Sequence, residues 1–175
     1  MFPSARNPVN CNDREVPERA NPEFVDRLYG EVALWCTTPE IGSARIVEMA
    51  CDALVAGLDG EGLAAVAGTS VGNEDWNFDA SVETMLVELG HEFPGRGSAV
   101  AQLGAVRAMC RRCLDGSVSP CALARWAHVV VGHTGTDEAQ LLVVLDDAYD
   151  EVQYAVETSE DLDRSVSEEA RRLAL

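Results

Sequence analysis

The chain has no lysine among its 175 residues, so all 13 of its basic side chains are arginines. Histidine occurs only at His91, His128 and His133, and aromatic residues make up 6% of the chain. No apolar run approaches the roughly 18 residues that a membrane-spanning helix needs. Residues 1–13 lack the apolar core of a secretory signal. These absences predict a cytoplasmic protein.

The six cysteines do not predict disulfide bonds, because without a secretory signal the compartment is expected to be reducing. Cys36 and Cys51 fall at apolar positions of expected helices, where a free thiol behaves as a small hydrophobic group. The cysteines therefore point to core packing, metal binding or thiol chemistry rather than to cross-links.

Acidic residues outnumber basic ones by 30 to 13, which makes the net charge −17. The charge is unevenly spread, because Asp115 is the only acid between Phe93 and Thr136, where five arginines lie. An excess of negative charge repels nucleic acid and anionic membranes, and it favours basic partners or simple solubility. We therefore expect no nucleic-acid and no membrane partner, while a homo-oligomer stays open.

Apolar residues recur at helical spacing in eight segments, most of which are separated by glycine or proline. The expected helices cover residues 22–36, 39–54, 61–67, 76–89, 99–114, 121–131, 137–152 and 159–173. Residues 1–20 hold three prolines and no apolar period, so we expect a flexible arm there and a single helical domain over 21–175. The predicted fold is all-α, an irregular orthogonal bundle of about seven to eight helices.

Capping residues mark several of the expected helix starts. Asn21, Ser98 and Ser119 are good N-caps, and prolines follow two of them in the first helical turn. Thr38, followed by proline, predicts the start of the second helix in the same way. Residues 128–133 and 141–147 are rich in β-branched side chains and could form a hairpin, but helical spacing continues across them.

One cluster of possible metal ligands consists of Cys110, Cys113, Cys121 and His128, with His133 close behind. Zinc takes four such ligands in a tetrahedron, so a zinc site is one alternative. A thiol-redox site is another, because a thiol at a helix start has a lowered pKa. Residues 109–114, however, have the pattern of a continuous helix rather than of a zinc knuckle. This favours the interpretation that the three cysteines are incidental small residues and not ligands.

Residues 146–150 read DDAYD, the letters of the DDxxD motif that binds magnesium and diphosphate in class I terpenoid synthases and prenyltransferases. Asp161, Ser165 and Glu169 are similar to the second metal motif of that family. On a helix, such carboxylates can share a hard cation such as Mg²⁺. The chain is far shorter than those enzymes and offers no cationic cluster beside either motif, so a magnesium-dependent enzyme is the less favoured alternative.

Acidic residues on the last two expected helices predict a binding surface for a basic protein partner, since opposed charges steer and tighten association. No nucleophile elbow is present, and residues 68–72 lack the lysine of a P-loop, so we expect no catalytic residue and no obligatory cofactor. The hypothesis is a non-enzymatic, acidic protein-binding module. Its expected partner-binding residues are Asp146, Asp147, Asp150, Glu151, Asp161 and Glu168.

Residues 114–128, LDGSVSPCALARWAH, and residues 145–150, LDDAYD, resemble small all-helical proteins of unassigned function from high-GC bacteria. Some helical immunity-type proteins share the cadence DG-x-x-S-P-x-x-x-A-R-W. The resemblance covers less than a third of the chain. It implies a helical fold with immunity-like or regulatory binding, and it carries over no catalytic residue.

Overall fold

The computed structural model describes residues 21–38, 40–72, 77–152 and 158–175. Over these ranges the chain forms eight α-helices, one short 3-10 helix and no strand, so the all-α prediction is confirmed. None of the described helices is long and apolar enough to cross a bilayer. The elements are α1 (Pro22–Thr37), α2 (Ala44–Val55), α3 (Glu61–Ala67), α4 (Phe78–Glu88), α5 (Ala99–Leu114), α6 (Pro120–Val130), η1 (Asp137–Ala139), α7 (Gln140–Glu151) and α8 (Ser159–Leu173).

Side-chain caps begin several of these helices, as the sequence predicts. The side chain of Asn21 accepts a hydrogen bond from the second residue of α1, and Ser98 and Ser119 accept from the third residues of α5 and α6. The stretches at 128–133 and 141–147 are the end of α6 with its following turn and most of α7, so no hairpin forms there. The expected arm over residues 1–20 lies outside the described residues.

The predicted helix start at Thr38 is wrong. The backbone N–H of Thr38 donates to the carbonyl of Leu34 at 2.8 Å, so this residue ends α1. Its hydroxyl oxygen is buried and has no hydrogen-bond partner among the described residues, so it caps no helix. The second helix begins six residues later, at Ala44, because the carbonyl of Thr38 first accepts the N–H of Ile41 in a turn.

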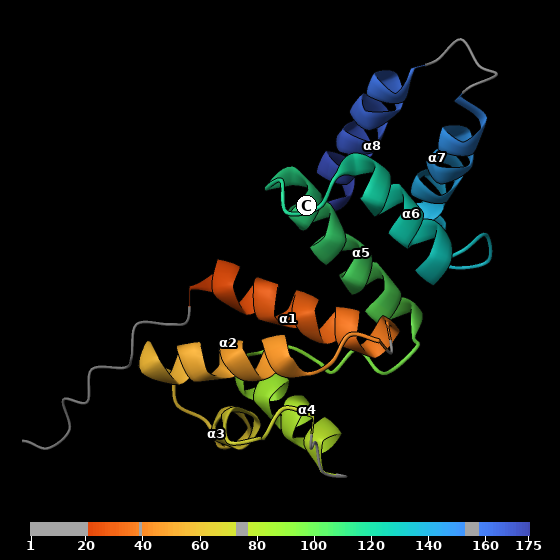
Figure 1. The fold of residues 1–175 in the computed structure, drawn as a ribbon. Coiled ribbons are helices and arrows are strands. Elements are labelled where there is room, and N and C mark those ends of the chain that lie inside the picture. The colour runs from red at the N-terminus through yellow and green to blue at the C-terminus, as the bar shows by residue number, and fades with distance from the viewer. Residues whose placement is uncertain (1–20, 39, 73–76, 153–157) are drawn as a thin grey trace, which may run out of the picture.

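The apolar interior forms two clusters that meet where α1 crosses α5. One cluster lies mainly within α1 to α4 and includes Ala101 of α5, and the other lies mainly within α5 to α8 and includes Ala33 and Leu34 of α1 (Figure 1). Glycines let the two crossing helices approach closely. A Cβ at position 104 would lie 2.8 Å from the Cβ of Ala33, and one at position 30 would lie 3.0 Å from the Cβ of Ala108.

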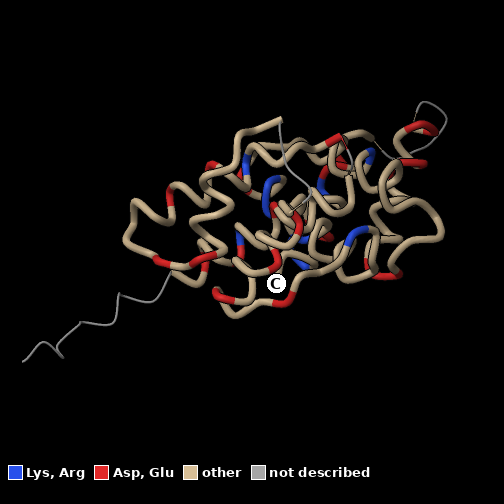
Figure 2. Tube along the Cα trace, turned by 90° about the horizontal axis from the view of Figure 1, so that it is seen from below, with Lys and Arg blue, Asp and Glu red and all other residues tan. Residues whose placement is uncertain are grey.

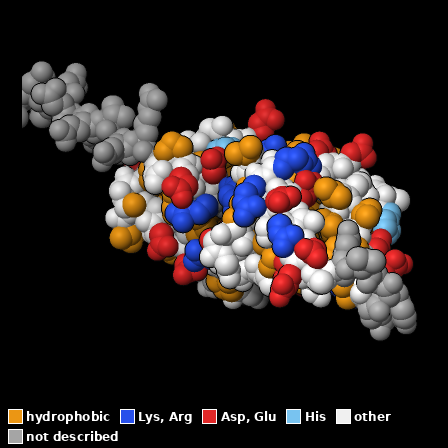
Figure 3. Space-filling view, turned by 90° about the horizontal axis from the view of Figure 1, so that it is seen from above, with side chains coloured by type: hydrophobic (Ala, Val, Ile, Leu, Met, Phe, Trp, Pro, Cys, Tyr) orange, Lys and Arg blue, Asp and Glu red, His pale blue; other side chains and the backbone are white. Residues whose placement is uncertain are grey.

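Most of the described arginines form ion pairs at the helix surfaces. The arginines lie within the body of the chain trace, whereas many acids follow its outline (Figure 2). On the face seen in Figure 3, arginines gather near the middle with acids between and around them. Arg96 shows the pattern: it donates to both carboxylate oxygens of Asp79 at 2.9 and 3.0 Å and covers the ring of Trp35. Its guanidinium lowers the pKa of Asp79.

Candidate metal centre

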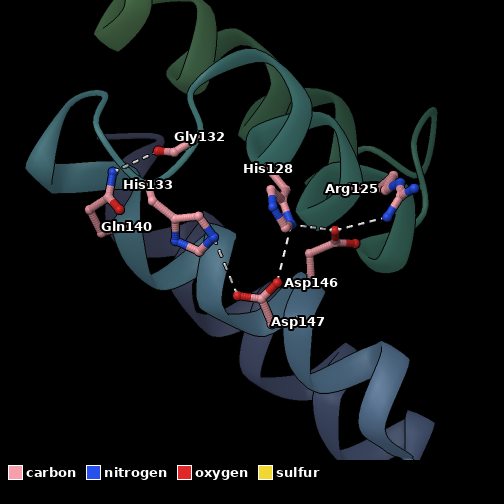
Figure 4. A network of polar contacts seen from close by, with 7 residues as sticks. All are labelled: Arg125, His128, Gly132, His133, Gln140, Asp146 and Asp147. Carbon is pink, nitrogen blue, oxygen red and sulfur yellow. Dashed lines mark hydrogen bonds and ion pairs between the residues drawn. The ribbon is translucent and has the colours of Figure 1, made fainter.

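The turn between α6 and α7 positions the first element of the site. Gly132 follows α6 with a φ of +63°, a left-handed conformation that glycine adopts without strain. The loop after it carries His133. At the start of α7, the side-chain amide of Gln140 donates to the carbonyl of Gly132 at 3.0 Å and lies 3.3 and 3.4 Å from two further loop carbonyls. This one side chain therefore holds the loop against α7 (Figure 4).

His128 reaches from α6 to a buried carboxylate on α7. Its Nδ1 donates to Oδ2 of Asp146 at 2.8 Å, because an ionised carboxylate only accepts. Asp146 is only 4% exposed, and Arg125 approaches the same oxygen at 3.3 Å. The buried carboxylate thus has an arginine on one side and an imidazole on the other, which offsets the cost of its burial.

Asp147 lies between the two imidazoles (Figure 4). Its Oδ1 is 3.4 Å from Nδ1 of His128, and its Oδ2 is 3.7 Å from Nε2 of His133. The centroids of the two imidazole rings are 5.0 Å apart, and the rings meet edge to face. Potential ligand atoms of His128, His133 and Asp147 all lie within 4.8 Å of one another, and among the described residues they form the only such group of three.

The separations around Asp147 fit a shared metal ion better than direct hydrogen bonds. They exceed the usual N–H···O range of about 2.7–3.2 Å. Two ligand atoms that each lie about 2.1 Å from one zinc ion at the tetrahedral angle are about 3.4 Å apart. The two separations involve different oxygens of Asp147, and one ligand atom from each of the three residues lies within 4.8 Å of the other two, so the group is compact enough to be a candidate metal site, with Asp146 behind it.

The predicted cysteine–histidine ligand set is not brought together. Cys110 is fully buried on α5, and burial raises the pKa of its thiol to about 12. Burial also raises the pKa of Cys113, while Cys121 is exposed at the start of α6. A metal takes the thiolate, which burial disfavours. Of the predicted set, His128 alone belongs to a described group of close ligand atoms.

The residues of the DDxxD-like pattern also separate. Asp146 turns inward toward α6, whereas Asp150 is exposed on α7 and is not part of the ligand group. Asp161 belongs to the capping box of α8, and hydrogen bonds from Thr158 and Arg164 lower its pKa to about 2. Glu169 is buried and pairs with an arginine of the same helix at 2.6 Å. These last two carboxylates stabilise α8.

The expected partner-binding acids fall into two groups, those that are buried or paired and those that are exposed and unpaired. Asp146 is buried and Asp161 is paired, so neither offers a free charge to a partner. Asp150, Glu151 and Glu168 are exposed and make no ion pair with the described residues. Of the two tryptophans in the described ranges, Trp35 is buried. The indole N–H of Trp126 has no described hydrogen-bond partner.

Sequence patterns singled out both halves of the site but did not join them. His128 and His133 belong to the cysteine–histidine pattern, and Asp147 belongs to the acidic one. The signal that connects them is the short break between the two helices, because such a break folds the end of one helix back toward the next. His91, the third histidine, lies elsewhere and packs against Tyr29, with the two ring centroids 5.1 Å apart.

Comparison with known proteins adds no constraint on this site. No family model, no curated protein and no solved structure matches the chain.

Proposed function

We propose that this chain is a metal-binding protein that takes one divalent transition-metal ion of the zinc class at His128, His133 and Asp147. The observation that carries the proposal is the 3.4 and 3.7 Å spacing of the Asp147 oxygens from the two imidazole nitrogens. Imidazole with carboxylate suits zinc and neighbouring transition metals, whereas magnesium prefers oxygen ligands alone. Three protein ligands leave a fourth position for water.

Such an ion links α6, the following loop and α7. His133 and Asp147 are 59% and 46% exposed at their side chains, so an ion reaches them from solvent. Binding through Nδ1 of His128 requires the tautomer with the proton on Nε2 and replaces the hydrogen bond to Asp146. Protons compete with a metal for imidazole nitrogens, so metal affinity falls as the pH is lowered. Arg125 then keeps the buried carboxylate paired. We infer a structural or regulatory role for the ion, because it fastens two helices.

Zinc titration of the chelator-treated protein tests the proposal. We expect one zinc ion per chain by calorimetry and elemental analysis. We also expect stabilisation against urea of about 2.7 kcal/mol at a zinc concentration a hundredfold above Kd. Asp147→Asn is expected to weaken zinc affinity by at least about tenfold, because it replaces a charged ligand with a poor neutral one.

Asp150→Asn is the matched control for this titration. It removes the same charge from the same helix, at an exposed position outside the ligand group. Its zinc affinity should equal that of the unchanged protein. An equal loss in both variants would show that bulk negative charge, not a site, attracts the ion, and a flat titration would refute the proposal altogether.

A second candidate function is recognition of a basic protein partner, and the exposed, unpaired carboxylates of α7 and α8 favour it. A genuine partner should be retained at low salt and released at high salt, because surface charges are screened. Neutralising three exposed acids of α7 and α8 should reduce capture of the partner several-fold. Neutralising three exposed acids elsewhere should leave capture unchanged. The test changes are Glu151→Gln, Glu160→Gln and Glu168→Gln, and the control changes are Glu61→Gln, Glu83→Gln and Glu92→Gln. Equal capture by both triple variants counts against this recognition.

A further inference from the structure

A groove of about 1290 Å³ lies along α1, α2 and α5, away from the metal centre. Small-molecule sites typically occupy about 300–1,000 Å³, so the groove has room for an organic ligand. Its walls hold both apolar side chains and arginines. In a chain with net charge −17, a concentration of arginines in one groove requires an explanation.

Five arginines line the groove, and two of them, Arg45 and Arg112, form ion pairs with Glu48 and Glu31. Most arginines in the described ranges form an ion pair within 4.0 Å, as the excess of acids leads one to expect. Arg27, Arg107, Arg111 and Arg171 have no such pair with a described residue, and the first three line the groove. Three of the four described arginines without an ion pair are therefore found in one groove.

Arg107 and Arg111 lie one turn apart on α5, where like charges repel each other. The Nε atom of Arg111 is buried and has no hydrogen-bond partner among the described residues. The same guanidinium is oriented by its Nη1, which lies 3.4 Å from the backbone carbonyl of Asp26 on α1. An anion in the groove relieves the repulsion and accepts hydrogen bonds from this oriented guanidinium.

The groove wall formed by α5 changes character along its length. Val100 and Leu103 line its first half, and Val100 is 59% exposed. Arg107 and Arg111 line its second half. Tyr29, stacked on His91, borders the same groove from the other side. The wall therefore offers an apolar stretch that leads to a cationic end.

We propose that this groove binds a small organic anion that has one acidic head group and an apolar tail. Its carboxylate or phosphate head lies at Arg27, Arg107 and Arg111, and its tail follows Val100 and Leu103. The guanidinium fork matches either head group through paired hydrogen bonds. Five acids also border the groove and disfavour polyanions such as nucleic acids. They are Glu23, Asp26, Glu31, Asp52 and Asp115, of which Glu31 is paired with Arg112.

Titration with short amphiphiles, followed by NMR or calorimetry, tests this site independently of the metal. The probes are decanoate, decyl phosphate, the cation decyltrimethylammonium and inorganic phosphate. We expect at least one of the two anionic amphiphiles to bind, with an affinity at least about tenfold above that of the cation and of inorganic phosphate. Arg107→Gln should reduce that affinity about tenfold, since it removes one charge-assisted contact.

Arg164→Gln is the control, because Arg164 is an exposed arginine on α8 outside the groove. Arg107 is exposed and makes no described ion pair, so its replacement should leave the urea midpoint unchanged. Binding of decanoate alone or of decyl phosphate alone identifies the head group and supports the site. Equal binding of the cation, equal binding of inorganic phosphate, or an equal loss in both arginine variants overturns it.

Discussion

Replacing Gly62 by alanine is expected to lower the free energy of unfolding by about 3 kcal/mol, the upper part of the range for an overpacked site. Gly62 lies in the first turn of α3 and is buried against α4. A Cβ at this position would lie 2.2 Å from the backbone nitrogen of Met85 and 2.7 Å from the carbonyl carbon of Thr84. Backbone atoms inside a helix cannot move aside as a side-chain tip can, so α3 must shift away.

That shift also breaks the link between the two helices. The backbone N–H of Gly62 donates to both carboxylate oxygens of Glu88 on α4, each at 3.1 Å. Glu88 therefore satisfies a free N–H at the start of α3 and places a negative charge near the positive end of the helix dipole. Movement of α3 loses this contact together with the packing of Leu63, which is 1% exposed.

Urea denaturation followed by circular dichroism measures the effect as a fall in midpoint. Gly42→Ala is the matched control, because position 42 is exposed, its φ is not positive, and a Cβ there meets nothing within 4 Å. The control should be neutral or slightly stabilising, since alanine restricts the unfolded chain. A midpoint for Gly62→Ala equal to that of the control would show that α3 and α4 are not packed as described.

Alkaline conditions are expected to destabilise the fold through its buried thiols. Burial raises the pKa of Cys110 from 9.0 to about 12 and that of Cys36 from 9.0 to about 11. The unfolded chain releases these protons first. The contribution to stability is therefore fully present below about pH 9 and is lost as the pH rises toward the folded values. For Cys110 the loss is about 1.4 kcal/mol per pH unit in that window, or roughly 4 kcal/mol in total.

Urea midpoints at a series of pH values from about 8 to 11 measure this loss. Cys110→Ala should flatten the alkaline decline, and adding Cys36→Ala should flatten it further. Cys51→Ala should leave the decline unchanged, because Cys51 is exposed. Part of the decline should persist in all variants, since the pKa of Tyr149 is also raised, by burial and by its hydrogen bond to Asp163. An identical decline in Cys110→Ala and in the unchanged chain would contradict the assignment.

Local chemistry accounts for most of the helix boundaries. Asn21, Ser98 and Ser119 begin helices because each side chain bonds to a backbone N–H within three residues of itself. Thr38 does not cap the second helix, because its own backbone N–H donates to the carbonyl of Leu34 and so ends α1. The patterns that succeeded depend only on near neighbours along the chain.

The candidate sites depend on contacts that no local pattern contains. His128, His133 and Asp147 are recognisable as possible ligands in the sequence, but their grouping requires the packing of α6 on α7 and the loop held by Gln140. The same packing buries Asp146 and removes it from the predicted partner surface.

The sequence by itself determined an all-helical, strongly acidic chain, because helical periodicity, caps and net charge are properties of neighbouring residues and of composition. Only the tertiary structure decided which charges meet. It paired most of the described arginines with acids, left Arg107 and Arg111 unpaired beside an apolar stretch, and placed Asp147 between two imidazoles. The physical reason is that charges act through space, and distances between helices follow from how their apolar faces pack.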